Sequence, residues 1–356
     1  MSNEKRVLVF GKGRYFEAKR KTISGQIIGF IDNYNMECSN GICTYRPNQI
    51  GGINYDAIYV MGTELNFIEM VYNLLDVGVS REKIIIGQNL KSYPFWEEAY
   101  MTEEDSFFID ENNKLCYRTG GIELAFYTYD EFYGIRDVFH KQDYECWMQG
   151  KAVVIDVGMN VGAASIYLAR KKNVEKVYSF EPFEPTYKTA LYNIKKNKAV
   201  ENKIVAINAG LGAEKAAKEI LYNSSMTCGL STDEELNKRA QNMYKEWELY
   251  RKDERKMQVQ ILDAAEIFAD IFQQNPKGRF ILKLDCEGAE YEILRRLREE
   301  NLLKKISMVM MEWHYNGDKE IRFYLEDCGF AYFSFPKDKN MGNIYAIRQS
   351  YIEEKL

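Results

Sequence analysis

Residues 152–170, AVVIDVGMNVGAASIYLAR, constrain the fold more than any other stretch of this 356-residue chain. They read as a strand of β-branched residues, a turn that holds Gly158 and Gly162, and a helix. Six further apolar runs of strand length follow, at 176–181, 203–208, 279–285, 306–312, 331–335 and 343–347. Strands that alternate with helices form a parallel sheet covered on both faces, and the last two runs are close enough in sequence to form an antiparallel hairpin. We therefore expect a seven-stranded α/β sheet.

A smaller α/β unit precedes this sheet. Helical segments alternate there with runs of strand character at 6–10, 26–32, 57–61 and 83–87. This alternation predicts a parallel, Rossmann-like sheet. One hydrophobic core rarely serves more than roughly 250–300 residues, so two domains are expected. We place them at 1–92 and 93–356.

Two segments of the second domain stand outside its strand pattern. Residues 93–150 hold two half-apolar runs around an Asn-containing turn, which predict a hairpin, and then a helix over 129–149. Residues 211–257 form a charged insertion with a predicted helix over 233–256. One face of that helix carries apolar side chains at alternating spacings of four and three: Leu236, Ala240, Met243, Trp247 and Tyr250. Three uses of this face stay open: packing on its own domain, covering a substrate, or joining two chains as a homo-oligomer.

Charge and composition narrow the class of partner. The net charge of −5 opposes a polyanion, so we expect no nucleic-acid partner. No run approaches the roughly 18 apolar residues that span a bilayer, and the first residues lack the apolar core of a signal peptide. We expect a cytoplasmic protein without a membrane span. The seven cysteines are scattered and only two histidines occur, which argues against a disulfide framework and against a His-rich metal centre.

Candidate binding residues lie where the strands end, because ligands of open α/β sheets bind beyond the carboxyl ends of the strands. In strand order these residues are Asp156, Gly158, Asn160 and Gly162; Glu181 and Pro182; Asn208; Asp285 and Glu287; and Glu312 and His314. We expect the side chains of this set to gather at one edge of the sheet.

The first of these turns differs from a dinucleotide-binding turn. Such a turn has the pattern Gly-x-Gly-x-x-Gly, in which the second glycine lets the backbone approach a pyrophosphate, and Asn160 occupies that place here. Asn tolerates a positive φ and offers both a donor and an acceptor. Glu181 lies 19 residues after Gly162, where an acid can take both hydroxyls of an adenosine ribose. The pattern favours a phosphate-free nucleoside that carries an amino-acid tail.

The chain resembles the FkbM-type family of S-adenosyl-L-methionine-dependent methyltransferases. Four segments carry the resemblance, in this order: VIDVGMNVG (154–162), YSFEPFEPTY (178–187), LKLDCEGAEYEIL (282–294) and MEWH (311–314). The resemblance covers about residues 105–350 and implies a seven-stranded Rossmann-like methyltransferase sheet with an antiparallel last strand. It also implies methyl transfer to a hydroxyl oxygen, commonly of a sugar. The charged insertion departs from the family pattern and leaves the acceptor open.

Carried over residue by residue, the resemblance assigns roles to the strand-end residues. The residues expected to contact the cofactor, S-adenosyl-L-methionine, are Asp156, Gly158, Asn160, Gly162, Glu181, Pro182, Asn208 and Asp285. The acceptor is expected to meet Glu287, Glu312 and His314. An acceptor hydroxyl needs a base within hydrogen-bond reach. His314 is the natural base at neutral pH, and Asp285 or Glu312 could orient it or act in its place.

The acceptor-side residues also have structural interpretations. Asp285 and Glu287 precede a helix and would cap it, and His314 ends an apolar strand, where a buried histidine is common. The three carboxylates and His314 would also suit a divalent cation such as Mg²⁺. Nothing in their spacing requires one, so the sequence assigns no metal ligand.

The N-terminal unit has a partial signature of its own. Gly11-x-Gly13 follows a strand and Asp32 lies 19 residues after Gly13, but no third glycine follows. A nicotinamide-dependent oxidoreductase or epimerase is therefore one alternative function, and a non-catalytic nucleoside-binding module is another. The unit resembles small Rossmann-like domains of bacterial polysaccharide-modifying proteins, which implies a sugar or nucleotide-sugar acceptor and a place in surface glycan biosynthesis. Ligand binding and docking are equally open for it.

Overall fold

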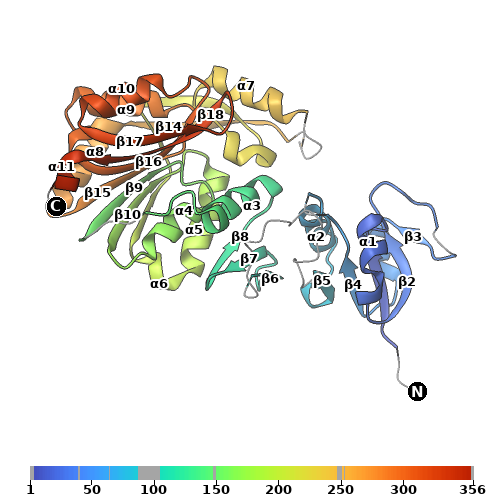
Figure 1. The fold of residues 1–356 in the computed structure, drawn as a ribbon. Helices are drawn as coiled ribbons and strands as arrows, with labels where there is room; N and C mark the ends of the chain where they lie inside the picture. Colours follow the sequence, from blue (N-terminus) through green and yellow to red (C-terminus); the bar gives the residue numbers. More distant parts are fainter. Residues whose placement is uncertain are drawn as a thin grey trace. The chain divides into compact units, whose positions relative to one another are not determined.

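The computed structural model describes residues 4–353 apart from 39–40, 64, 87–104, 147–149, 247–250 and 252. The chain forms two compact units, Met1–Phe132 and Tyr133–Leu356. Figure 1 shows the helices and strands of each unit. Within the described ranges, no helix is both long enough and apolar enough to cross a membrane.

The first unit begins with a five-stranded parallel sheet in the order β3-β2-β1-β4-β5. Its strands are β1 (Arg6–Phe10), β2 (Gln26–Ile31), β3 (Thr44–Tyr45), β4 (Ala57–Val60) and β5 (Ile84–Ile86). Helices α1 (Arg14–Lys19) and α2 (Phe67–Asp76) lie between them in the chain. The predicted parallel sheet is confirmed. Only β3 was not predicted, because two residues are too few to show a pattern.

Three antiparallel strands complete the first unit: β6 (Ser106–Ile109), β7 (Leu115–Thr119) and β8 (Ile122–Ala125). The sequence predicted one hairpin here and assigned it to the second domain. Tyr72 of α2 ties these strands to the first unit, because its hydroxyl donates to the Phe126 carbonyl at 2.7 Å and accepts from the Leu115 amide at 3.1 Å. The predicted boundary at 92/93 lies outside the described residues.

The second unit is built on a seven-stranded sheet in the order β11-β10-β9-β15-β16-β18-β17. Its strands are β9 (Ala152–Val157), β10 (Val174–Phe180), β11 (Ile204–Ile207), β15 (Arg279–Leu284), β16 (Ile306–His314), β17 (Phe330–Pro336) and β18 (Met341–Arg348). The first five run parallel, and β18 pairs antiparallel with both β16 and β17. The predicted fold, a seven-stranded Rossmann-like sheet with an antiparallel last strand, is confirmed.

Helices cover both faces of this sheet (Figure 1). On one face lie α4 (Ala163–Ala169) and α5 (Glu184–Lys196), followed in the chain by α6 (Lys198–Glu201). On the other face lie α8 (Ala264–Gln274), α9 (Glu290–Glu299) and α10 (Lys319–Asp327), and α11 (Gln349–Glu353) follows the last strand. Buried side chains of α8 to α10, such as Phe268, Leu294 and Ile321, pack with the sheet into one core. This two-sided cover leaves the carboxyl ends of the strands free for a site.

The helix before the sheet is shorter than predicted. α3 spans Tyr129–Arg136 and continues as a π-helical turn over Asp137–Lys141. Gln142 then takes a left-handed conformation, with φ of 58°, and ends the helix. The prediction of a helix over 129–149 is therefore wrong at its C-terminal end, and residues 147–149 lie outside the described part of the chain.

The charged insertion is a small sheet with a helix. β12 (Gly210–Gly212), β13 (Ala216–Tyr222) and β14 (Arg255–Asp263) pair in the order β12-β14-β13. The helix predicted over 233–256 is too long: α7 spans Glu234–Tyr244, and β14 begins at Arg255. Of the predicted apolar stripe, Ala240 is buried and Met243 is 44% exposed. Trp247 and Tyr250 lie outside the described residues, so the stripe is not complete in the structure.

Candidate active site

The predicted strand-end residues meet at one edge of the seven-stranded sheet. They lie in the last residues of β9 and β16 or directly follow β9, β10, β11 and β15, and these strands are neighbours in the sheet and run parallel. Residues that are up to 158 positions apart in the chain therefore share one site: Asp156 and His314 are the outermost pair. The site has two halves, a turn after β9 with its neighbours and a group of acidic side chains around His314.

The turn after β9 contains three residues with positive φ: Gly158 (84°), Asn160 (49°) and Gly162 (88°). A side chain at Gly158 would overlap the carbonyl oxygen of Asp285 and would lie 2.7 Å from its carbonyl carbon. Glycine is therefore required at 158 by close approach as well as by conformation. The turn after β9 packs directly against the backbone after β15.

Glu181, which directly follows β10, holds this turn through hydrogen bonds to backbone N–H groups. Its buried carboxylate accepts hydrogen bonds from the backbone N–H groups of Asn160 at 2.9 Å and Phe183 at 3.0 Å. Burial raises the pKa of Glu181 to about 7, against the lowering effect of these two N–H groups. Each carboxylate oxygen accepts one of the two bonds, so each keeps a lone pair that can accept from a ligand hydroxyl.

Two amide side chains connect the turn to its surroundings. The exposed Asn208 donates to the carbonyl oxygens of Glu181 at 2.8 Å and Pro182 at 3.2 Å. Asn160 donates to the carbonyl oxygen of Thr227 at 3.1 Å, which lies in the insertion between β13 and α7. The insertion therefore reaches the predicted cofactor turn.

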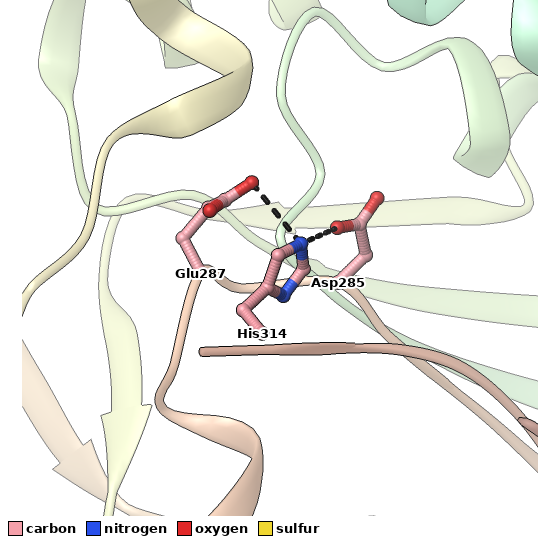
Figure 2. Close-up of side chains that lie close together, drawn as sticks. All are labelled: Asp285, Glu287 and His314. Carbon is pink, nitrogen blue, oxygen red and sulfur yellow. Dashed lines mark ion pairs between the residues drawn. The ribbon is translucent and has the colours of Figure 1, made fainter. Parts of the chain in front are cut away.

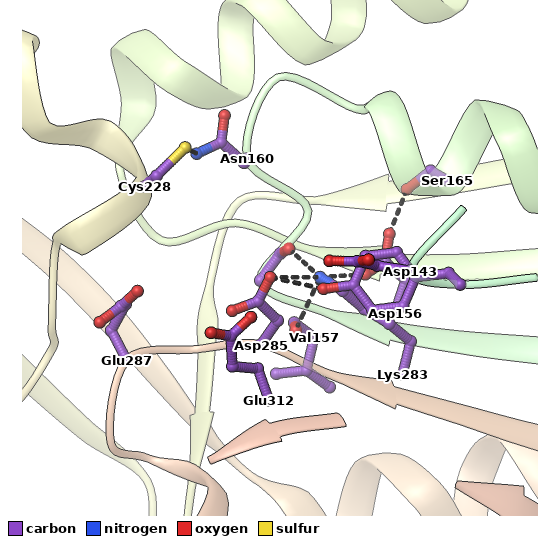
Figure 3. A network of polar contacts seen from close by, with 12 residues as sticks. Asp143, Asp156, Val157, Asn160, Ser165, Cys228, Lys283, Asp285, Glu287 and Glu312 are labelled. Atoms are coloured by element: carbon purple, nitrogen blue, oxygen red, sulfur yellow. Dashed lines mark hydrogen bonds and ion pairs between the residues drawn. The ribbon is translucent and has the colours of Figure 1, made fainter. Parts of the chain in front are cut away.

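Asp156 supports the turn from inside the protein. Its carboxylate and the ammonium of Lys283 are 3.0 Å apart, with side-chain exposures of 0% and 2%. Ser165 donates to the second carboxylate oxygen, and Lys283 also donates to the carbonyl oxygen of Gly158 at 2.5 Å (Figure 3). The sequence predicted that Asp156 contacts the cofactor. In the structure Asp156 is buried and holds the turn through Lys283 and Ser165, and its contact with the cofactor stays a prediction.

The second half of the site surrounds His314. Its Nε2 lies 3.3 Å from Oε1 of Glu287 and 4.0 Å from both Oδ1 of Asp285 and Oε1 of Glu312. Figure 2 shows this nitrogen between the carboxylates of Glu287 and Asp285. The other ring nitrogen, Nδ1, lies 2.5 Å from Oε1 of the fully buried Glu290. The structure thus brings together the three residues that the sequence assigned to the acceptor, Glu287, Glu312 and His314, and places Asp285 beside them.

Crowding and burial separate the pKa values of these groups. Burial raises the pKa of Glu287 to about 8 and also raises that of Glu312. Burial alone would raise the pKa of Asp285, but Lys283 and His314 outweigh it and lower the value. Burial would lower the pKa of His314, but the carboxylates of Glu287 and Glu290 raise it well above 6.5. His314 therefore holds its proton to a higher pH than a free imidazole, and Asp285 releases its proton at a lower pH than a free carboxyl.

Four side chains of the site were not identified from the sequence: Tyr144, Lys283, Glu290 and Lys337. Tyr144 donates to Oδ2 of Asp285 at 2.7 Å, and Lys337 donates to Oε2 of Glu312 at 2.9 Å. A lysine inside the apolar strand RFILKL was a signal for Lys283, and the LDCEGAE segment contained Glu290. Tyr144 and Lys337 lie outside the motifs, and no pattern pointed to them.

The partial signature of the N-terminal unit has local roles. Gly11 has a φ of 91°, and a side chain there would lie 2.8 Å from the Met61 carbonyl oxygen. Oδ1 of Asp32 accepts from the N–H groups of Tyr34 and Asn35, both at 2.9 Å, and so closes its own turn. These contacts add no support to the nicotinamide-dependent alternative.

The strand order, the antiparallel β18 and the turn after β9 place the second unit in the class of Rossmann-like methyltransferases. The comparison with known families is more specific. The family model of the methyltransferase FkbM domain matches residues 156–332, and the chain belongs to the FkbM-type methyltransferase family. The predicted family is thereby confirmed.

Two curated relatives support this assignment. The methyltransferase sdnD of Sordaria araneosa is 28% identical over 190 residues, which are 50% of this chain and 73% of that protein. Methyltransferase 1 of Beauveria bassiana is 26% identical over 183 residues, 50% of this chain and 72% of that protein. Both matches span about half of this chain, so these relatives support the family assignment for that half alone.

Among solved structures, the methyltransferase FkbM from Methylobacillus flagellatus matches 97% of this chain and 90% of its own, with 11% identity and a TM-score of 0.38. A putative tRNA (m1A22) methyltransferase of Streptococcus pneumoniae in complex with S-adenosyl-L-methionine matches 56% of this chain and 67% of its own. That match has 14% identity and a TM-score of 0.33.

Proposed function

We propose that this chain is an S-adenosyl-L-methionine-dependent O-methyltransferase whose acceptor is a hydroxyl of a sugar, a nucleotide sugar or a related small molecule, in surface glycan synthesis. One observation carries the proposal: the turn after β9 is in backbone contact with Asp285, the first residue of the acidic group. A place suited to a nucleoside with an amino-acid tail therefore adjoins a place suited to a polyhydroxylated acceptor.

The cofactor half fits a nucleoside that has no phosphate. Glu181 has one lone pair on each carboxylate oxygen for the two ribose hydroxyls, and Asn208 is exposed beside it for the base. Asn160 stands where a pyrophosphate-binding turn has its second glycine. S-adenosyl-L-methionine would supply a methyl group that its sulfonium makes electrophilic.

The acceptor half offers hydrogen-bond acceptors to hydroxyl groups. Asp285, Glu287 and Glu312 would position a polyhydroxylated acceptor so that one oxygen lies in line with the S–CH₃ bond. The new C–O bond forms as the C–S bond breaks, the electron pair of that bond stays on sulfur, and the hydroxyl proton passes to the group of Asp285, Glu312 and His314. Because the pKa of His314 is raised well above 6.5, the imidazole acts as the base only in its neutral form, in which Nε2 carries the lone pair.

Calorimetric titration of the full chain with S-adenosyl-L-methionine, S-adenosylhomocysteine and NAD tests the cofactor. We expect both sulfur ligands to bind and NAD not to bind. A ligand at 100 times its Kd would add about 2.7 kcal/mol to the free energy of unfolding, so a thermal-shift assay checks the same point. The proposal is refuted if neither sulfur ligand binds, and preferential binding of NAD would favour an oxidoreductase or epimerase.

Methyl transfer is then followed with isotopically labelled S-adenosyl-L-methionine and a panel of sugars and nucleotide sugars. We expect His314→Ala and Asp285→Asn to lower the rate by about 10²–10⁴-fold while S-adenosylhomocysteine still binds. Asp270→Asn, an exposed acid on α8, is the control and should leave the rate unchanged. Cofactor binding without transfer to any acceptor would identify the non-catalytic binding module instead.

A further inference from the structure

A buried carboxylate holds the imidazole of His314 in one orientation. Nδ1 lies 2.5 Å from Oε1 of Glu290, and Oε2 of Glu290 accepts the backbone N–H of Gly288 at 2.6 Å. The side chains of His314 and Glu290 are 3% and 0% exposed. Because a carboxylate accepts a proton from Nδ1, the lone pair of the neutral ring lies on Nε2. Metal-binding histidines are usually held from behind by a carboxylate or carbonyl in this way.

The lone-pair nitrogen faces carboxylate oxygens that are themselves held in place. Asp285 has Oδ2 bound by Tyr144 and turns Oδ1 towards Nε2, and Glu312 has Oε2 bound by Lys337 and turns Oε1 towards it. Oε1 of Glu287 is the nearest, at 3.3 Å. In the protonated ring, Nε2 and Glu287 form an ion pair. In the neutral ring, Nε2 and these carboxylate oxygens are all acceptors that face one another, and a cation that replaces the proton can bind them together.

The charges of this group lack enough cationic partners. Lys337 pairs with Glu312, and Lys283 lies 3.0 Å from Asp156 but 3.9 Å from Asp285. In the described part of the chain, the ion pairs of Glu287 and Glu290 are with His314 alone. Ionised Glu287 and Glu290 together carry two negative charges, which a divalent cation balances and a single imidazolium does not.

We propose that Asp285, Glu287 and His314 bind a divalent cation, with Glu290 as the carboxylate that orients the histidine. One ligand atom from each of the three residues lies within 4.8 Å of the others. Atoms that share an ion through bonds of about 2.1 Å lie about 3 Å apart when adjacent and about 4.2 Å apart when opposite, so the side chains need to close only slightly. Two carboxylates and one imidazole suit Mn²⁺, which accepts both oxygen and nitrogen ligands.

A cation with three protein ligands has open positions for an acceptor. Two neighbouring oxygens of the acceptor would fill them, which makes a vicinal diol, or a hydroxyl beside a carboxylate, the favoured substrate class. The cation lowers the pKa of the bound hydroxyl, and Glu312 is the adjacent carboxylate that receives the proton. This step rests on the proposed function, whereas cation binding itself does not.

Titration of the metal-stripped full chain with Mn²⁺, followed by electron paramagnetic resonance of the free ion, tests the site. We expect saturable binding of a single ion per chain, with competition by Mg²⁺ and Zn²⁺. Glu287→Gln and His314→Ala should weaken binding by more than ~100-fold, and Glu290→Gln, which removes the orienting charge, by about 10–100-fold. Glu299→Gln, an exposed acid on the same helix as Glu290, should leave the affinity unchanged.

The inference is overturned if the wild-type chain shows no saturable binding, or if Glu287→Gln and Glu290→Gln bind Mn²⁺ as tightly as the wild type. Circular dichroism and S-adenosylhomocysteine titration check that each variant is folded, and Asp285→Asn replaces any variant that is not. If the wild-type chain binds S-adenosylhomocysteine but does not bind Mn²⁺, this inference alone is overturned. If the chain binds Mn²⁺ but binds neither S-adenosyl-L-methionine nor S-adenosylhomocysteine, the proposed function alone is overturned.

Discussion

Gly158→Ala is expected to disturb the site through the addition of one methyl group. Gly158 has a φ of 84°, where a residue with a side chain costs about 1–2 kcal/mol. The new Cβ would also overlap the carbonyl oxygen of Asp285 and lie 2.7 Å from the carbonyl carbon, closer than the 3.0 Å that real Cβ atoms keep. Overpacking of this kind costs about a further 1–3 kcal/mol. We expect the free energy of unfolding to fall by about 2–5 kcal/mol in total.

Gly329→Ala is the matched control for this change. Gly329 follows α10 with a φ of 77°, and nothing lies within 4 Å of an added Cβ, so only the conformational cost of about 1–2 kcal/mol applies. Urea unfolding measures both losses. Calorimetry with S-adenosylhomocysteine should show a loss of affinity of about tenfold or more for Gly158→Ala alone, because the backbone at Asp285 must move. Equal losses of stability with unchanged affinity would refute the steric role of Gly158.

Two further substitutions test the buried charges of the site. Lys283→Met removes the cationic partner of the buried Asp156 carboxylate, to which Ser165 still donates, and should lower the free energy of unfolding by about 3–5 kcal/mol in urea. The added Asp156→Asn should recover part of this loss, and a loss below ~1 kcal/mol would contradict the reasoning. The pKa of Glu181 is about 7 in the folded chain, against about 4.3 in the unfolded chain. Between pH 4.3 and pH 7, roughly, the folded chain therefore binds more protons than the unfolded chain, and the free energy of unfolding falls as the pH rises. Glu181→Gln should remove about 3 kcal/mol of this fall, and an unchanged pH profile of the urea midpoint would contradict the assignment.

The main elements of both sheets could be predicted because their signals are local. β9 is buried at every position and reads as a continuous apolar run, as do β15 and most of β16. The insertion was harder to predict. β13, with the sequence AAKEILY, lacks the alternation of polar and apolar residues that is typical of a half-buried strand. β14 is stabilised by pairing with β12, which lies more than 40 residues earlier. Pairing over that distance leaves no local pattern, so a helix was predicted across part of a strand.

The residues of the site could likewise be predicted from the sequence only in part. The rule that ligands bind at the carboxyl ends of parallel strands identified Glu181, Asp285, Glu287, Glu312 and His314 from their positions alone. It did not reveal Tyr144 or Lys337, whose contacts with the carboxylates depend on segments that fold over the sheet edge. It also did not reveal that Lys283 on the neighbouring strand lies opposite Asp156 and pairs with it.

The sequence by itself determined the order of strands and helices, the family and the residues that end each strand, since hydrophobic period and motif spacing are properties of the chain. Only the tertiary structure decided which of those side chains face a ligand and which face each other. Nε2 of His314 is directed at Asp285 and Glu287 because Glu290, the first residue of α9, holds the opposite ring nitrogen. Such a direction depends on packing between elements, and no local pattern encodes it.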